Sequence, residues 1–278
     1  MSRILVAKFV FKNCVVKYFN DGGRIISRIK AQPQKDDVFL DRNFEPLDDD
    51  QIFSKENDFY TFLGLAIDNY SVSQATEAAI GYLLLQNRSC FPPHAFILCP
   101  DEYNLNGWGI GKSLLAEGIA KMCKPYKKHA GELVIGEYDD VDFFRNYTPH
   151  NNLLIIEDVP ACFNYAYLFN YITGAWIIRQ TMKEAYCVNA VVPRMLLCAQ
   201  KHPGHQTSSF NCRFVVLPMS DYFGGERNTR PLDVFGHVLF DSWNEKQWSL
   251  FDNFMFYCIE QYIKNGEDLF INLRTRYD

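Results

Sequence analysis

The spacing of apolar residues changes along the chain. Residues 4–19 alternate weakly between apolar and polar side chains and are followed by the turn-forming stretch Asn-Asp-Gly-Gly at 20–23, which is typical of β-hairpins. Between 59 and 85 the apolar positions recur at helical spacing in two runs, and the second run begins after Ser73, a residue type that caps helices. We therefore expect β-structure first and helices after it.

From residue 95 onward, short apolar runs alternate with helical or turn-like segments. The runs expected to form strands are 95–99, 132–136, 152–156, 195–199 and 214–218. Such alternation favours a mostly parallel sheet with helices on its faces. We expect a last helix between Asn244, a residue type that caps helix starts, and Gly266. We interpret the aromatic stripe along this helix as part of the core.

Composition narrows the class of protein. The 278 residues are 48% hydrophobic and 15% aromatic, which suffices for a packed core. The net charge of −5 argues against a broad basic surface that coats nucleic acid, but it permits a few basic residues in a narrow channel. No apolar run reaches transmembrane length and no secretory signal is recognisable, so we expect no membrane partner and a cytoplasmic location, in a bacterium or a host cell.

The cysteines and histidines do not suggest a metal centre. The nine cysteines are scattered and form no Cys-x-x-Cys pair, as in a reduced cytosolic protein. His202 and His205 have the spacing of metal ligands, but no acid or cysteine stands beside them. We interpret that stretch as a loop.

One glycine-rich stretch lies between a predicted strand and a predicted helix. Residues 106–113 read Asn-Gly-Trp-Gly-Ile-Gly-Lys-Ser, and the helical pattern after them includes Leu115 and Ile119. This is the context of a phosphate-binding loop. Glycines let several backbone N–H groups point at phosphate oxygens, and the helix start adds partial positive charge. Asn106 departs from the strict motif, which has a glycine there.

These residue types indicate a site for ATP and Mg²⁺. Lys112 would reach the outer phosphates, and Ser113 would hold the metal ion. The candidate nucleotide-binding residues are Asn106, Gly107, Gly109, Gly111, Lys112, Ser113 and Leu114. An ordinary turn that happens to contain Gly-Lys-Ser is the alternative.

Two acids, Glu157 and Asp158, follow the apolar run 152–156. One carboxylate at such a strand end can orient the metal ion and its waters, and the other can polarise the attacking water. We assign Glu157 to the metal ion and Asp158 to the water. Apolar strands often end in surface acids, so this assignment depends on the upstream Gly-Lys-Ser.

Together these signals predict an α/β fold of the P-loop NTPase (AAA+-like) type, with a mostly parallel sheet, a small β-rich N-terminal appendage and flanking helices. We divide the chain into a β-rich appendage and linker (1–50), a helical collar segment (51–93), the P-loop ATPase core (94–240) and a C-terminal helical segment (241–278). The polar stretch 32–50, with its prolines and acidic run, marks the first boundary.

Several blocks, taken in order, resemble superfamily-three helicases, in particular the phage and mobile-element branch related to poxvirus-type primase-helicases. Besides the phosphate loop and the acidic strand, the resemblance rests on residues 79–84, 95–102, 168–175, 214–223 and 231–236, and it covers about 75–263. It implies a hexameric, ATP-driven motor that translocates on single-stranded DNA through a central channel.

The resemblance also implies roles outside the phosphate loop. Lys183, with Arg179 nearby, takes the place of a basic hairpin residue that touches the nucleic-acid backbone. Gln200 stands where the family usually has an asparagine that senses the γ-phosphate. Arg213 is the one retained member of an arginine pair that reaches the neighbouring subunit's nucleotide, and Arg194 is a second choice for that role.

We therefore expect an ATP-dependent replicative DNA helicase of a phage or mobile element, a homo-hexamer acting on single-stranded or forked DNA. No primase carboxylate cluster is recognisable, so a primase that takes part would be a separate polypeptide. The alternative is a nucleotide-binding ring-assembly module with the helicase fold but little or no unwinding activity. Three departures from the family pattern favour this alternative mildly: Asn106, Gln200 and the single Arg213. Two structural interpretations also stay open: Lys183 is an ordinary solvated lysine, and Arg213 forms an ion pair within its own subunit.

Overall fold

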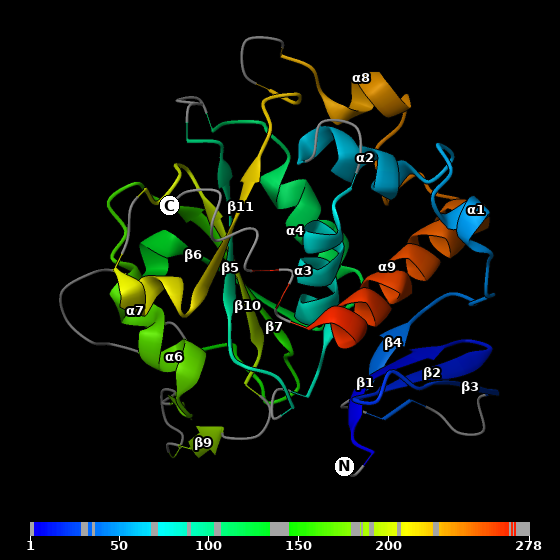
Figure 1. The fold of residues 1–278 in the computed structure, drawn as a ribbon, viewed down its shortest axis with the longest axis horizontal. Coiled ribbons are helices and arrows are strands. Elements are labelled where there is room, and N and C mark those ends of the chain that lie inside the picture. The colour runs from blue at the N-terminus through cyan, green and yellow to red at the C-terminus, as the bar shows by residue number, and fades with distance from the viewer. Residues whose placement is uncertain are drawn as a thin grey trace.

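The structure is a computed structural model (Figure 1). It describes residues 3–28, 33–34, 37–67, 72–87, 90–102, 107–133, 145–178, 184, 186–188, 192–204, 207–224, 228–266, 268 and 270. A small N-terminal sheet, a group of helices and a larger central sheet make up the fold.

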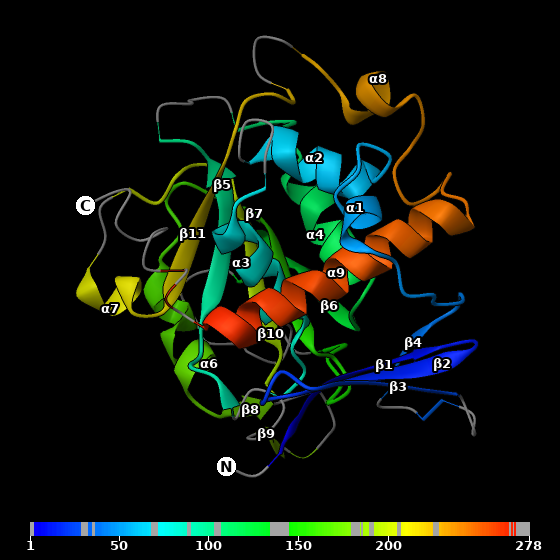
Figure 2. The ribbon, with the colours of Figure 1, turned by 45° about the vertical axis from the view of Figure 1, so that its right-hand side comes forward.

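The N-terminal sheet has the strand order β3-β2-β1-β4. Its strands are β1 (Leu5–Phe11), β2 (Cys14–Phe19), β3 (Arg24–Arg28) and β4 (Val38–Leu40). Alternate residues of a strand point to opposite faces, so Phe9, Phe11 and Tyr18 share one face, where their rings pack against Phe256 of the C-terminal helix. The predicted β-rich appendage is confirmed, and Figure 2 shows it beneath that helix.

Three helices that follow the N-terminal sheet in the chain pack against the long C-terminal helix. These helices are α1 (Asp49–Ile52), α2 (Asp58–Ala66), α3 (Gln74–Leu84) and α9 (Glu245–Asn265), and α9 contacts the other three. The Ser73 hydroxyl accepts a hydrogen bond from the backbone of α3, and the Asn244 side chain accepts one from the backbone of α9. Gly266 ends α9. The predicted helix boundaries at these residues are confirmed.

The central sheet has the order β11-β5-β10-β7-β6, and all neighbouring strands are parallel. Its strands are β5 (Ala95–Pro100), β6 (Pro125–His129), β7 (Leu153–Val159), β10 (Arg194–Ala199) and β11 (Phe214–Met219). Along β5, Phe96 and Leu98 face one hydrophobic core while Ala95 and Ile97 face another. Burial on both faces produces the continuous apolar runs of the sequence. The predicted α/β, P-loop NTPase-like class is confirmed.

The predicted strand 132–136 does not form in the part that the structure describes. Residues 130–133 form a 3₁₀-helix, η2 (Ala130–Leu133), residues 134–136 lie outside the described residues, and the strand beside β7 is β6. β6 is an edge strand in which Lys127 and His129 are exposed, so it lacks a continuous apolar run. Strands were predicted from continuous apolar runs. The prediction therefore missed β6 and chose the Leu-Val-Ile stretch that begins at Leu133.

Helices cover both faces of the central sheet (Figures 1 and 2). One face holds α3, α4 (Lys112–Ala120) and α9; the other holds η3 (Tyr165–Leu168), α6 (Phe169–Thr173) and α7 (Ser208–Asn211). A hairpin of β8 (Trp176–Ile178) and β9 (Tyr186–Val188) follows α6, and α8 (Pro231–Phe235) lies near α2. Among the described helices, none is both long and apolar enough to cross a membrane.

The parallel sheet brings the predicted chemistry to one edge. Because the five strands run in the same direction, their C-terminal ends meet there. The glycine-rich loop follows β5, Glu157 and Asp158 lie near the C-terminal end of β7, and Gln200 follows β10. This edge is the place where a ligand of an open α/β sheet is expected.

Candidate nucleotide site

The described part of the loop between β5 and α4 has a backbone conformation that favours glycine. Gly109 and Gly111 have φ angles of 74° and 95°, in the left-handed region. A Cβ on Gly107 would lie 2.5 Å from the carbonyl oxygen of Gln200. The loop is therefore seated closely on the end of β10. Asn106 lies outside the described residues.

Lys112 is the first residue of α4, and its Nζ donates a hydrogen bond back to the carbonyl of Gly107. Burial lowers the pKa of Lys112, while nearby thiols and the carboxylates of Asp158 and Glu157 oppose this shift. The first turn of α4 carries no side-chain cap. The N–H groups of a helix start attract anions, so a cationic side chain and a helix N-terminus coincide here.

Ser113 and Glu157 meet at the site. The Ser113 Oγ donates a hydrogen bond to Glu157 Oε2 over 3.0 Å, although the two residues are 44 positions apart. A hydroxyl and a carboxylate are oxygen ligands of the kind that Mg²⁺ takes beside phosphates and water. The two residues predicted to hold the metal ion are thus brought together. Leu114 packs against the core beneath.

Asp158 departs from regular strand geometry. Its φ is 56°, and the register between β7 and β10 shifts between Leu197 and Ala199. A bulge re-aims the side chains of a strand, and strained backbone gathers at functional sites. The Asp158 Oδ2 lies 3.2 Å from Nδ1 of His129, and both side chains are exposed.

Sequence reasoning missed His129. It ends β6 and is paired in register with Glu157 of β7. The only signal in the sequence is a histidine after two lysines. The histidine can be assigned to the site only when β6 is known to pair with β7, which carries the two acids.

Gln200 lies between the phosphate loop and the two acids. Its backbone N–H donates to the carbonyl of Val159 over 2.8 Å, and its own carbonyl lies against Gly107. Its side chain is partly exposed. Two residues earlier, burial raises the pKa of the Cys198 thiol. The role of Gln200 as a phosphate sensor stays a prediction.

Arg213 lies at the opposite edge of the sheet. Its carbonyl accepts a hydrogen bond from the N–H of Ala95, at the start of β5, whereas the phosphate loop follows Pro100 at the end of that strand. Six residues at about 3.3 Å each place the two edges roughly 20 Å apart. Its Nη1 donates to the Ser209 carbonyl over 2.9 Å, and its guanidinium lies 4.9 Å from the ring centre of Phe169.

The second-choice arginine has a structural place. Arg194 is 2% exposed, lies over the ring of Tyr82 and donates to the Leu85 carbonyl. A buried guanidinium of this kind cannot reach a neighbouring subunit. Arg179 and Lys183, the predicted DNA contacts, lie outside the described residues.

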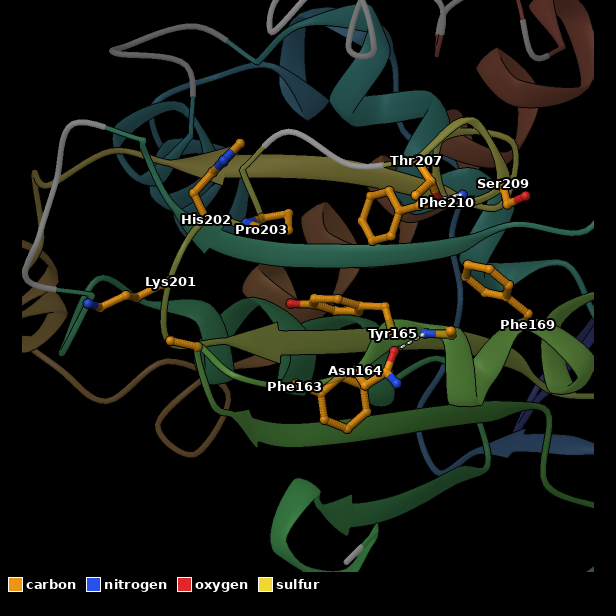
Figure 3. A pocket seen from close by; sticks show the side chains of 12 residues that line it. Phe163, Asn164, Tyr165, Phe169, Lys201, His202, Pro203, Thr207, Ser209 and Phe210 are labelled. Atoms are coloured by element: carbon orange, nitrogen blue, oxygen red, sulfur yellow. Dashed lines mark hydrogen bonds between the residues drawn. The ribbon is translucent and has the colours of Figure 1, made fainter. Parts of the chain in front are cut away.

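A groove of about 420 Å³ lies on the sheet face away from α4, and sequence reasoning missed it as well. Its walls come from the segment that follows β7 and the segment that follows β10 (Figure 3). Phe163, Tyr165 and Phe210 line it, together with Lys201 and Ser209. The two walls are separated in sequence, so no local pattern announces them.

Comparison with known proteins gives distant similarities only. No protein-family model matches the chain, and no curated protein matches it. An apo structure of the NrS-1 C-terminal region, residues 305–718, is 14% identical with a TM-score of 0.41, and the match covers 75% of this chain and 44% of that one. A second apo structure of the same region is 12% identical with a TM-score of 0.44, and the match covers 91% of this chain and 65% of that one. A structure of JCV helicase with a bound phenylacetamide compound is 12% identical and has a TM-score of 0.34; the match covers 74% of this chain and 61% of that one.

The chain therefore spans less than two thirds of the length of each of these structures. At these identities and TM-scores, the similarities add nothing to what the residues of the site indicate.

Proposed function

We propose that the chain is an ATP-dependent replicative DNA helicase of superfamily three, from a phage or mobile element, acting as a homo-hexameric ring on single-stranded or forked DNA. One observation carries the nucleotide part. Ser113, directly after a glycine-rich turn that ends in Lys112, lies 3.0 Å from Glu157 at the end of β7. This arrangement supports binding of ATP with Mg²⁺.

Each side chain of the site has a task that its position allows. Lys112 would exchange its bond to the Gly107 carbonyl for one to the outer phosphates. Ser113 and Glu157 would hold Mg²⁺, which when bound neutralises charge on the phosphate oxygens. Asp158 would take the proton of the attacking water, with its carboxylate oriented by His129.

Other subunits and DNA form the second part of the proposal. Arg213 lies at the edge away from its own phosphate loop, which favours action on the nucleotide of a neighbouring copy. Arg179 and Lys183 are assigned to the DNA backbone from the sequence alone. A primase that takes part would be a separate polypeptide, and we expect the protein in the cytoplasm.

The test is ATP hydrolysis and strand separation by the purified chain. Hydrolysis should require Mg²⁺ and rise with single-stranded DNA, and electron micrographs with a non-hydrolysable ATP analogue should show six-fold rings. Lys112→Ala should weaken ATP binding roughly 10- to 100-fold, since hydrogen bonds to charged groups contribute about 1.5–3 kcal/mol. Lys121→Ala, which removes a half-exposed lysine paired with Glu117 of the same helix, is the matched control. Unchanged affinity in Lys112→Ala would remove the basis of the proposal.

A ring-assembly module that binds nucleotide without unwinding is the second candidate. It is favoured by the bond between Lys112 and the loop's own Gly107 carbonyl, together with the longer amide at Gln200. Nucleotide-dependent rings that neither hydrolyse ATP steadily nor separate strands would decide for this module.

A further inference from the structure

The phosphate loop is packed against α2, a helix that precedes the central sheet in the chain. A Cβ on Gly111 would lie 3.0 Å from Cζ of Phe62 and 3.1 Å from its Cε2, so this ring touches the backbone of the loop. Seven residues further along α4, a Cβ on Gly118 would lie 2.3 Å from Cε2 of Phe59. Seven residues are about two helical turns, so both glycines lie on the face of α4 that meets α2. Figures 1 and 2 show the two helices side by side.

Gly111 needs a support from outside the loop to keep its conformation. Its φ of 95° is in the left-handed region, and a residue without a side chain can leave that region at little cost. It is the N-cap of α4, and its carbonyl accepts a hydrogen bond from the N–H of Leu115 over 2.9 Å. Rotation of Gly111 would therefore turn the first N–H groups of α4, at Lys112 and Ser113, away from a bound phosphate.

The Phe62 ring is itself fixed. It is fully buried, and it stacks on the rings of Phe59 and Phe223, whose centres lie 6.1 and 5.4 Å away at interplanar angles of 29° and 28°. Phe223 is fully buried as well. In a close-packed interior, a ring held in this way cannot withdraw from Gly111 unless its neighbours move too.

α2 is anchored at both ends. At its start, the carboxylate of Asp58 accepts a hydrogen bond from Nε1 of Trp243 over 3.1 Å. At its end, the Oγ and the N–H of Ser220 donate to the last two carbonyls of the helix, over 2.7 Å each. Ser220 follows β11, which is paired with β5, the strand that leads into the phosphate loop. The position of Phe62 is thus set relative to the sheet that carries the loop.

We propose that Phe62 is a positioning residue of the nucleotide site, whose ring holds Gly111 and thereby keeps the phosphate loop in its anion-binding conformation. The inference rests on the proposed function, because it assumes that phosphate binds in this loop. It brings a side chain of the predicted collar segment, 51–93, into the site. A loop that is held in place before its ligand arrives binds more tightly, because less conformational freedom is lost on binding.

Hydrogen exchange in the nucleotide-free protein is the first measurement. Phe256→Leu is the matched control for lost stability, because Phe256 is also fully buried but packs against the N-terminal sheet. In Phe62→Leu, the amide of Leu115, which is bonded to the Gly111 carbonyl, should exchange at least about tenfold faster than in this control, because the first turn of α4 opens more readily. Equal exchange at Leu115 in the two variants would overturn the inference.

Nucleotide affinity is the second measurement, made at a temperature where circular dichroism shows every variant to be folded. Phe62→Leu should raise the Kd for a fluorescent ATP analogue with Mg²⁺ roughly 10- to 100-fold, the size of effect that a displacement of about 1 Å has at a reacting site. Phe256→Leu should bind as the parent does. Phe62→Met, whose flexible side chain fills gaps, should lie between Phe62→Leu and the parent, and it replaces Phe62→Leu in both measurements if that variant does not fold.

The two proposals fail in different ways. A parent that binds the analogue, with equal affinities in Phe62→Leu and Phe256→Leu, would overturn the inference alone. A parent that binds no nucleotide would overturn the proposed function, and exchange at Leu115 would still show whether Phe62 holds the loop.

Discussion

At the residue scale, the two acids of β7 differ in their partners. Glu157 accepts a hydrogen bond from Ser113, whereas Asp158 contacts His129. Asp158→Asn should therefore leave ATP bound but slow hydrolysis roughly 10²–10⁴-fold, as loss of a general base does. Glu157→Gln should instead raise the Mg²⁺ concentration needed for ATP binding. Titrations of nucleotide and Mg²⁺ beside steady-state rates separate the two effects, and parent rates in both variants would exclude this strand end.

His129 gives a finer prediction. If it orients Asp158, His129→Ala should lower kcat roughly tenfold, a small part of the effect of a general base, with unchanged affinity for ATP. His129→Asn should recover most of the loss, because its side-chain amide can donate where Nδ1 lies 3.2 Å from Asp158. Lys127→Ala, on the same strand and paired with Glu117, is the control. Equal rates in the alanine and asparagine variants would contradict an orienting role.

The contiguous part of the site could be predicted from the sequence, and the rest could not. Gly107 to Ser113 carry their geometry in adjacent residues, because glycine adopts φ angles such as those of Gly109 and Gly111 more readily than any other residue. His129 reaches the site from another strand, and the groove has walls from two distant segments. Contacts of this kind depend on how strands are aligned, which local spacing does not encode.

At the scale of elements, burial decided which strands could be predicted. β5, β7, β10 and β11 are covered on both faces and appear in the sequence as apolar runs. β6 lies at the sheet edge with alternating exposed residues, and it was not among the strands that the sequence predicted. A strand that is half exposed leaves a weaker pattern than a buried one.

The crossing of α3 and α9 depends on one glycine. A Cβ on Gly81 would lie 2.0 Å from the carbonyl oxygen of Cys258, an atom of the α9 backbone. Gly81→Ala should therefore lower the free energy of unfolding by about 1–3 kcal/mol through overpacking, despite alanine's better helix propensity. Gly131→Ala is the control, because nothing lies within 4 Å of its Cβ position. Urea unfolding compares them, and equal stabilities would show that the helices separate without cost.

A buried ion pair ties the chain after β4 to α9. Arg42 Nε donates to Asp252 Oδ2 over 2.7 Å, and the carboxylate is fully buried. Burial raises the pKa of Asp252 from 3.8 to about 6, an effect that Arg42 only partly offsets. The folded state thus binds this proton more tightly than the unfolded state does.

The stability contributed by Asp252 is consequently complete below pH 3.8 and is lost as the pH rises through about 6. Two pKa units correspond to about 3 kcal/mol. Asp252→Asn should remove this dependence of stability on pH. Between pH 4 and 7, the free energy of unfolding of the parent should therefore fall by about that amount relative to that of the variant. A constant difference across the range would contradict the raised pKa.

At the scale of the whole molecule, the sheet separates two halves of the proposed chemistry. Lys112 follows the end of β5, and Arg213 is bonded at its start. The sequence could suggest both residues but could not show that they lie at opposite edges. The four segments 1–50, 51–93, 94–240 and 241–278 remain a prediction, although each contributes side chains to one shared core.

This separation leads to a prediction about mixed assemblies. Arg213→Ala should spare ATP binding and reduce hydrolysis by orders of magnitude, because an arginine supplied in trans is worth roughly 10³–10⁵ in rate in well-studied nucleotidases. Mixing Arg213→Ala with Lys112→Ala subunits should restore part of the activity, since some interfaces then join an intact phosphate loop to an intact arginine. An arginine that acted within its own subunit could not be rescued in this way, because every chain would lack half of its own site. ATPase rates across mixing ratios, with mixed assembly verified by differently labelled subunits, measure the effect. Verified mixed rings that recover no activity would return Arg213 to a structural role beside Ser209 and Phe169 and would favour the assembly module over the motor.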